Sequence, residues 1–275
     1  MANADGRSSR ASDDRYGDSL FTRRPTGGCH THYECGANAN ISIEPIDRSF
    51  AHSKTAWRQS VLRVGKTMTT QQESRAQAMS PQYVLDRCEA VPAIIGDPSD
   101  LLIVCGLAGA SKDVASLTSD GANVFTTGGV MGAAVSIGLG LALSQPERRV
   151  LVATGDGELL MNVGSLATVA VVNPPNLAIL CIDNGHYGET GYQLSHTSLG
   201  VDLTAMAQGA GIVNTHTVEN EDDVENGARM LRESNGSSFV LMRVAPTPPP
   251  TFKRELDPAV CRTRFRNFLG YAPRG

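Results

Sequence analysis

The sequence predicts an α/β protein with a mainly parallel β-sheet and helices on both of its faces. Four uninterrupted apolar runs, residues 101–105, 150–154, 177–182 and 239–242, are typical of strands buried on both faces. Helical stretches separate these runs, and strands that alternate with helices form right-handed βαβ units and parallel sheets. The 28 glycines and 5% aromatic residues indicate aliphatic packing with many tight turns.

Weaker patterns give the remaining elements. Shorter apolar runs at 123–126 and 211–214 predict two further strands, and helices are expected over 130–143, 159–172, 203–209 and 222–233. A first helix is expected to begin with Ser80 as N-cap and Pro81 at its first position. Apolar residues then follow at helical spacing, namely Tyr83, Val84, Cys88 and Val91.

The chain divides into three segments by composition. Residues 1–78 are rich in Ser, Arg, Asp and Asn without a hydrophobic period, which predicts a disordered or poorly ordered extension. Met68 is an alternative chain start, in which case residues 1–67 are not translated. Residues 79–245 form the predicted α/β domain, and residues 246–275 form a proline-rich exit with a basic tail.

Charge and composition exclude several classes of protein. The net charge of −4 does not favour nucleic acid or an anionic membrane as the partner. The sequence has no apolar run of about 18 residues and no apolar signal segment at its N-terminus. The six cysteines are scattered, and Cys105 and Cys181 lie within predicted strands as small core residues. A soluble, cytoplasmic protein is expected.

Three unusual turns follow strands of the predicted sheet, and ligands of open parallel sheets bind at such strand ends. The turns are residues 126–132, 155–157 and 183–187. Asp156 lies between two glycines, and Asn184 follows the neighbouring strand. Their oxygen atoms suit Mg²⁺, which shares its octahedron with phosphate oxygens and water. The turns predict a diphosphate–Mg²⁺ site, although an ordinary Asx turn at Asp156 is the alternative.

The motif spacing resembles that of a known family. Gly155-Asp156-Gly157, 25 further residues and then Asp183-Asn184 resemble the thiamine-diphosphate signature. The likeness covers about residues 92–244, the diphosphate-binding domain of the 2-oxo-acid decarboxylase superfamily. The stretches GDGELLMNVGSLAT and DNGHYGETGYQ look like those of sulfopyruvate decarboxylase β subunits and of the matching half of phosphonopyruvate decarboxylase.

The resemblance implies a role for each matching residue. Mg²⁺ would be bound by the side chains of Asp156 and Asn184 and by the carbonyl of His186. The diphosphate would receive the N–H groups of Gly157 and Glu158. Glu158 stands where a small residue is usual, so its carboxylate is expected to point away from the diphosphate.

The same resemblance gives roles to three further residues. The Gly129 carbonyl would receive the 4′-amino group of the cofactor, and Met131 would be the apolar wedge that bends it. Ordinary packing at a helix start is the alternative for Met131. Tyr187 is expected to contact the diphosphate.

The implied reaction is decarboxylation of a 2-oxo acid to an aldehyde, and the acyl group is not specified. In the family that the chain resembles, the glutamate that protonates the pyrimidine N1′ comes from a separate pyrimidine-binding domain, which we do not expect within this chain. The resemblance therefore implies a separate pyrimidine-binding subunit, with the cofactor at the subunit interface. No catalytic residue is assigned in this chain.

Several alternatives stay open. The glycine-rich turn at 126–132 would also suit a nucleotide-dependent oxidoreductase, although it lacks a GxGxxG motif. Glu158 would suit a non-catalytic subunit that binds thiamine diphosphate without turnover. A zinc site at residues 29–35, through Cys29, His30, His32 and Cys35, would lie in the polar extension. His196 and Glu189 are either substrate-side groups or solvated loop residues.

Overall fold

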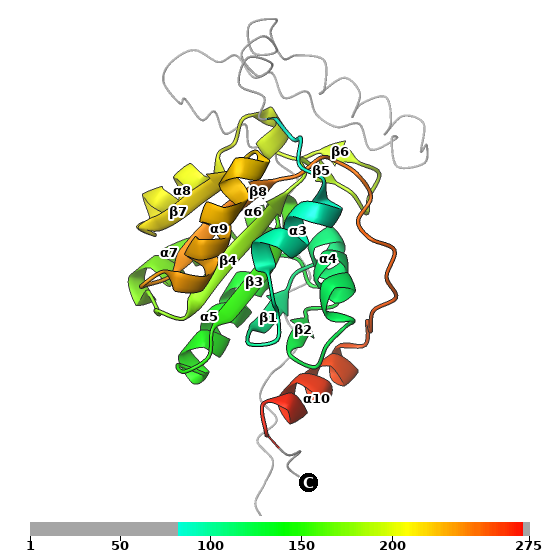
Figure 1. Cartoon of the computed structure of the whole chain (residues 1–275), viewed down its shortest axis with the longest axis vertical. Coiled ribbons are helices and arrows are strands. Elements are labelled where there is room, and N and C mark those ends of the chain that lie inside the picture. Colours follow the sequence, from blue (N-terminus) through cyan, green and yellow to red (C-terminus); the bar gives the residue numbers. More distant parts are fainter. Residues whose placement is uncertain (1–81, 272–275) are drawn as a thin grey trace, which may run out of the picture. The chain divides into compact units, whose positions relative to one another are not determined.

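The computed structural model describes residues 82–271 of the chain. These residues form a six-stranded parallel sheet with the strand order β2-β1-β3-β4-β8-β7 (Figure 1). The predicted parallel α/β fold is confirmed. The strands are β1 (Leu102–Cys105), β2 (Val124–Thr126), β3 (Val150–Gly155), β4 (Leu177–Asp183), β7 (Asn214–Val218) and β8 (Ser238–Arg243), and a separate antiparallel hairpin consists of β5 (His186–Tyr187) and β6 (Gln193–Leu194).

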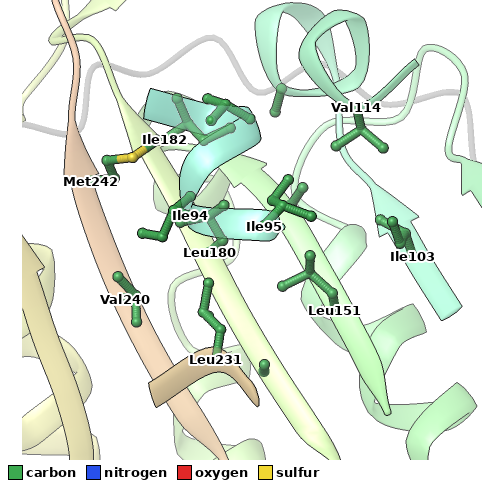
Figure 2. Close-up of a cluster of buried hydrophobic side chains, with 14 of the residues drawn as sticks. Ile94, Ile95, Ile103, Val114, Leu151, Leu180, Ile182, Leu231, Val240 and Met242 are labelled. Atoms are coloured by element: carbon green, nitrogen blue, oxygen red, sulfur yellow. The ribbon is translucent and has the colours of Figure 1, made fainter. Parts of the chain in front are cut away.

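Helices cover both faces of the sheet (Figure 1). One face is covered by α3 (Arg87–Ile95), α4 (Ala108–Thr118) and α9 (Glu221–Glu233). The other face is covered by α5 (Ala134–Ser144), α7 (Ser165–Val172), α8 (Leu203–Ala210) and α10 (Pro258–Phe268). Figure 2 shows the core of the first face, where Ile94 and Ile95 of α3 lie over Leu180 and Leu151 of the sheet.

The central strands are buried on both faces, which explains why their sequences are apolar at every position. All seven residues of β4 are buried. Leu180 packs toward α3 and α9, whereas its neighbours Ile179 and Cys181 pack toward the opposite helices. Side chains of a strand alternate between the two faces, so a strand covered on both sides needs an apolar residue at every position. Cys105 and Cys181 are fully buried, as predicted.

The first helix begins later than the spacing predicted. Helix α3 starts at Arg87, and the Asp86 carboxylate accepts a hydrogen bond from the backbone N–H of Cys88. Tyr83 therefore precedes the helix, and Leu85 forms an isolated parallel bridge with Val244. Pairing with the sheet keeps this segment extended, so the helix starts only at the next capping residue.

Two other predicted elements differ in detail. The predicted helix over 159–172 is two helices, α6 (Asp156–Leu160) and α7, joined by a turn in which the Ser165 hydroxyl donates to the Asn162 carbonyl. The sixth strand, β7, begins at Asn214 and continues to Val218, rather than covering 211–214. Its residues are mostly half-buried because it is an edge strand, which explains the weak apolar signal.

The segment 246–275, predicted as an exit and a tail, contains helix α10. Its Cys261 and Phe265 are buried, and the Phe125 ring of β2 lies 5.8 Å from that of Phe265. Asp257 caps the helix by accepting from the N–H of Ala259. Arg262, Arg264 and Arg266 give α10 a strongly polar face, which hides its short apolar stripe in a sequence pattern.

Several predictions fall outside the described residues. They concern the extension at 1–78, the start at Met68, the cap at Ser80 with Pro81, and the zinc cluster at 29–35. Within residues 82–271, no helix combines the length and apolarity that a membrane crossing requires.

Candidate functional site

The candidate site lies where the strand order reverses. The chain passes from β1 outward to β2, then returns to place β3 on the other side of β1. The loops that follow β1 and β3 run in opposite directions, which opens a crevice at the carboxyl ends of these two strands. Ligands of open parallel sheets bind in such crevices. A pocket of about 140 Å³ lies at this position, lined by the loop after β1, the turn after β3 and the hairpin after β4.

The pocket brings together most of the residues expected from the sequence. Its lining includes Met131, Asp156, Gly157, Glu158, Asn184, His186 and Tyr187. Gly129 is not part of this lining and lies exposed in the loop between β2 and α5. The two turns after β3 and β4 meet because these strands are neighbours in the sheet, as predicted.

Asp156 and Asp183 form a buried pair of carboxylates. Asp156 is 2% exposed, and its Oδ2 accepts hydrogen bonds from the hydroxyls of Ser195 and Thr197, the latter at 3.1 Å. The Thr197 hydroxyl also lies 2.7 Å from Asp183 Oδ1, which accepts from the N–H of Gly185. Burial raises the pKa of both carboxyls, and the charge of Asp156 raises that of Asp183 further.

This pair has no cation in direct contact in the described part of the chain, although the charge of Arg243 lowers the pKa of Asp183. Neither carboxylate forms an ion pair there with a lysine, arginine or histidine. Buried carboxylates without a cation are costly, because burial removes the water that solvates them. A divalent cation beside Asp156 would offset this cost, so the local electrostatics fit a metal ion.

Asn184 and His186 contribute oxygen atoms from the turn after β4. The Asn184 Oδ1 accepts from the N–H of His186 at 3.1 Å, and Gly185 between them has φ 66°. This is an Asx turn with a residue in the left-handed region, which glycine adopts without strain. The Asn184 amide, the His186 carbonyl and the Asp156 carboxylate are hard oxygen donors of the kind that Mg²⁺ prefers.

Gly157 has no room for a side chain because Tyr187 lies against it. A Cβ at Gly157 would be 2.3 Å from Cε1 of the Tyr187 ring. The Tyr187 hydroxyl lies 3.4 Å from Nδ1 of His196, which is exposed. Because Gly157 has no side chain, a ligand can approach its backbone N–H directly.

Glu158 is directed into the interior at the end of β1. It is 4% exposed, and its Oε2 accepts hydrogen bonds from the N–H of Leu107 and the hydroxyl of Thr154, both at 2.9 Å. Its Oε1 has no hydrogen-bond partner among residues 82–271. Burial raises the pKa of this carboxyl. The Glu158 side chain lies within the pocket lining. That its carboxylate points away from a bound diphosphate remains a prediction.

Sequence analysis missed several groups around the pocket. Ser195 and Thr197 lie about 40 residues after Asp156 and have no local motif that marks them. Tyr83 donates to Asp183 at 3.5 Å, and burial raises the pKa of its hydroxyl to about 12. The loop after β1 was missed as well, although Leu107 and Gly109 line the pocket, and the glycines at this strand end are a signal that could have marked it.

Two cationic side chains line the pocket, and each faces a carboxylate. The buried Arg87 donates through Nε and Nη2 to Asp113, at 3.1 and 2.5 Å. Lys112 of α4 lies 3.4 Å from Glu189 of the hairpin at the rim. Glu189 is thus an exposed residue with an ion-pair partner.

Comparison with known proteins assigns the family. Residues 109–242 match the thiamine pyrophosphate enzyme family, in the part described as its C-terminal TPP binding domain. The β subunit of sulfopyruvate decarboxylase from Methanothermobacter thermautotrophicus is 45% identical over 128 residues, 46% of this chain and 68% of that protein. The chain therefore belongs to the thiamine pyrophosphate enzymes, and within them it is similar to sulfopyruvate decarboxylase β subunits.

Other relatives agree with this assignment. The β subunit of sulfopyruvate decarboxylase from Methanococcus maripaludis is 31% identical over 67% of this chain and 98% of its own length. Phosphonopyruvate decarboxylase from Streptomyces viridochromogenes is 35% identical over 65% of this chain, which spans only 44% of that protein. The assignment favours a thiamine enzyme over a nucleotide-dependent oxidoreductase.

Solved structures share the fold. The 4-hydroxybenzoylformate decarboxylase of Rhodococcus jostii, which is thiamine diphosphate-dependent, has a TM-score of 0.50 and 19% identity. It is matched over 60% of this chain and 34% of its own. A Mycobacterium smegmatis protein assigned as thiamin diphosphate-dependent has a TM-score of 0.50 and 24% identity, over 59% of this chain and 32% of its own. The chain thus spans about a third of these structures.

Proposed function

We propose that this chain is the thiamine-diphosphate-binding subunit of a two-subunit 2-oxo-acid decarboxylase, of the sulfopyruvate or phosphonopyruvate type. The observation that carries the proposal is the buried Asp156 carboxylate, which lies where the strand order reverses and forms no ion pair within residues 82–271. Oxygen donors of Asn184 and His186 line the same pocket. The similarity to decarboxylase β subunits supports the reaction class, and a cytoplasmic location remains an expectation.

The residues of the pocket fit the cofactor by their chemistry. Asp156, Asn184 and the His186 carbonyl would hold Mg²⁺, and the N–H groups of Gly157 and Glu158 would donate to the diphosphate. When bound, thiamine diphosphate would supply the nucleophilic carbon and the electron sink for decarboxylation. This chain's own contribution is to bind and orient the cofactor.

Met131 and Gly129 would orient the other end of the cofactor. Met131 lines the pocket and is 37% exposed, so its side chain is available to an apolar ring. A Cβ at Gly129 would meet no atom within 4 Å, so the backbone there is open to a partner group. Both residues belong to the loop that precedes α5, and neither is among the residues proposed to bind the diphosphate.

An apolar surface beside this loop supports a partner subunit. Residues 121–146 and 159–182 contain no Asp, Glu, Lys or Arg, although parts of them lie on the surface. Helices α5 and α7 lie side by side there, and Asn162 Nδ2 donates to the Gly132 carbonyl at 3.1 Å. The exposed apolar side chains of this charge-free surface are Val130, Met131, Ile137, Leu143, Met161, Val171 and Val172.

The chemistry of the charge-free surface suits a protein interface. The centres of such interfaces are depleted in charged residues and enriched in apolar ones, and large exposed apolar patches are uncommon on monomers. The surface reaches the pocket through Met131. We therefore place a pyrimidine-binding subunit over it, so that this subunit can present its glutamate to the cofactor.

The proposed function is tested by titrating the full chain with thiamine diphosphate, with and without Mg²⁺, in a calorimeter. Binding is expected to depend on Mg²⁺, and Asp156→Ala should weaken it at least about thirtyfold, because truncating one partner of a buried charge pair costs about 2–5 kcal/mol. Asp222→Ala, an exposed carboxylate on α9, is the control and should bind like the wild type. Equal binding by Asp156→Ala would show that the site lies elsewhere.

A non-catalytic subunit would pass this test and fail the next one. Mixed with the pyrimidine-binding subunit, the chain should release CO₂ from sulfopyruvate, phosphonopyruvate or a simple 2-oxo acid. Tight Mg²⁺-dependent binding without CO₂ release from any of them would favour the non-catalytic alternative.

A further inference from the structure

We infer that the Glu158 carboxylate occupies one backbone N–H donor of the pocket lining, that of Leu107, and that it must leave this donor when a diphosphate binds beside the N–H groups of Gly157 and Glu158. The inference rests on the proposed function and deepens it, because it names a residue that sets the affinity of the same site. Glu158 thereby acts as an internal competitor of the diphosphate.

The contacts of Glu158 are those of a bound anion. Its Oε2 accepts from the backbone N–H of Leu107 and from the Thr154 hydroxyl, both at 2.9 Å. Leu107 is the N-cap residue of α4, and no side chain of its own turn caps this 11-residue helix. The carboxylate therefore bridges the ends of β1 and β3, where the strand order reverses and where a ligand is expected.

The space for this carboxylate comes from Gly106. A Cβ at Gly106 would lie 1.6 Å from Glu158 Oε2, so every other residue type there would displace the carboxylate. The fit indicates that the inward position of Glu158 is a feature of this sequence rather than an arbitrary rotamer.

The charge of Glu158 is not neutralised by a side chain of the described residues. The cations of the pocket lining, Arg87 and Lys112, are paired with Asp113 and Glu189 instead. Oε1 lacks a hydrogen-bond partner in the part of the chain that the structure describes, although the residue is only 4% exposed. A phosphate group that entered beside this carboxylate would meet hydrogen-bond donors that Glu158 already occupies, and it would be repelled by a like charge.

The carboxylate borders the space proposed for the diphosphate. Glu158 itself lines the pocket of about 140 Å³, so an anion that takes the Leu107 N–H must displace its carboxylate. Binding of a diphosphate would then break two hydrogen bonds of Glu158 before it forms its own. The affinity of the chain for diphosphates is reduced by the free energy of this displacement.

The test measures binding of inorganic diphosphate and of thiamine diphosphate, each with Mg²⁺, to the full chain by calorimetry. Glu158→Gln removes the charge and keeps the shape, and Glu158→Ala removes both. We expect each variant to bind both ligands at least about tenfold more tightly than the wild type, since like-charge contacts cost more than one tenfold step. Glu147→Gln, an exposed carboxylate at the opposite end of β3, controls for net charge and should change neither affinity.

The outcomes separate the inference from the proposed function. Unchanged or weaker binding in both Glu158 variants, with wild-type binding intact, overturns the inference and leaves the function standing. Absence of binding in the wild type and in both variants overturns both. Circular dichroism and thermal unfolding accompany each titration, and Glu158→Gln retains the packing if Glu158→Ala does not fold.

Discussion

Asp156 and Asp183 lie at the ends of two neighbouring strands and share one hydroxyl group, that of Thr197. The Thr197 oxygen is 3.1 Å from Asp156 Oδ2 and 2.7 Å from Asp183 Oδ1. One hydroxyl proton serves one acceptor at a time, so the two carboxylates compete for it. The arrangement holds two acidic groups together at the site proposed for a cation.

Replacement of Thr197 by valine tests this arrangement. Thr197→Val keeps the shape and removes the hydroxyl, so the free energy of unfolding should fall by about 1–3 kcal/mol, the cost of leaving buried acceptors unsatisfied. Mg²⁺-dependent binding of thiamine diphosphate should also weaken, because Asp156 loses a group that orients it. Chemical denaturation and calorimetry measure the two effects.

Thr204→Val is the matched control for this variant. The buried Thr204 hydroxyl bonds to that of Thr217 at 2.7 Å, away from the pocket. Its loss should affect stability alone. If both variants bind the ligand equally well, Thr197 has no part in the site.

Met131→Ala is expected to lower the turnover of the reconstituted enzyme more than its cofactor affinity. A residue that holds the cofactor in its reactive shape contributes a geometric effect that reaches orders of magnitude in rate. Met206→Ala on α8, where the side chain is 41% exposed, is the control and should leave turnover unchanged. Steady-state kinetics with a cofactor titration separates kcat from affinity. A Met131→Ala enzyme with normal kcat per folded molecule would make Met131 a packing residue.

The charge-free surface should be needed for the partner subunit. Val171→Asp places a charge on this surface, where Val171 is 87% exposed, and should weaken association at least about tenfold, since a buried unpaired charge costs several kcal/mol. Val213→Asp, at 89% exposure outside this surface, should associate normally. Co-purification and analytical ultracentrifugation measure the complex. Without its partner, the chain should release no CO₂ from any 2-oxo acid.

The ion pair between Asp120 and Arg264 ties α10 to the turn after α4, and it should make stability depend on pH. Arg264 donates to both Asp120 oxygens, at 2.8 and 2.9 Å. Burial opposes ionisation, but the hydrogen bonds and charge of Arg264 outweigh it and lower the pKa of Asp120. A carboxyl with a lowered pKa in the folded state stabilises the fold above its unfolded pKa, and this contribution is lost as the pH falls through the folded pKa.

Asp120→Asn should therefore cost about 1 kcal/mol at pH 7, and the difference from the wild type should shrink below about pH 4. Asparagine suits the positive φ of 53° at this position, so the variant does not strain the backbone. Glu219→Gln removes a more exposed pair with Arg243 and should cost less than about 0.5 kcal/mol. A difference that stays constant from pH 7 to pH 3 would contradict the assignment.

Gly106→Ala should reveal the position of the Glu158 carboxylate in the ligand-free chain. The added methyl group collides with Glu158 Oε2, so the substitution should cost about 1–3 kcal/mol in the wild type and less in a Glu158→Ala background. Gly140→Ala in α5 is the control, since a Cβ there meets nothing within 4 Å, and it should be neutral or slightly stabilising. Equal costs of Gly106→Ala in both backgrounds would mean that the two residues do not touch.

The sequence by itself determined the sheet and the two polar turns of the site. Uninterrupted apolar runs such as that of β4 indicate strands covered on both faces, because each face needs its own apolar residues. The turns at Asp156 and Asn184 directly follow two such runs, so their place at one sheet edge follows from the fold class. These features depend on residues close together in the chain.

Only the tertiary structure decided which distant groups meet at these turns. Leu107 and Glu158 are 51 residues apart, and Ser195 lies 39 residues from Asp156. Their contacts depend on the strand order and on the path of the hairpin, which no local period encodes. For the same reason, the bridge from Leu85 to Val244 delays α3, and packing on β2 brings a helix into the predicted tail. The physical cause is common to all: each contact joins segments that lie far apart in the chain, and the tertiary fold brings these segments together.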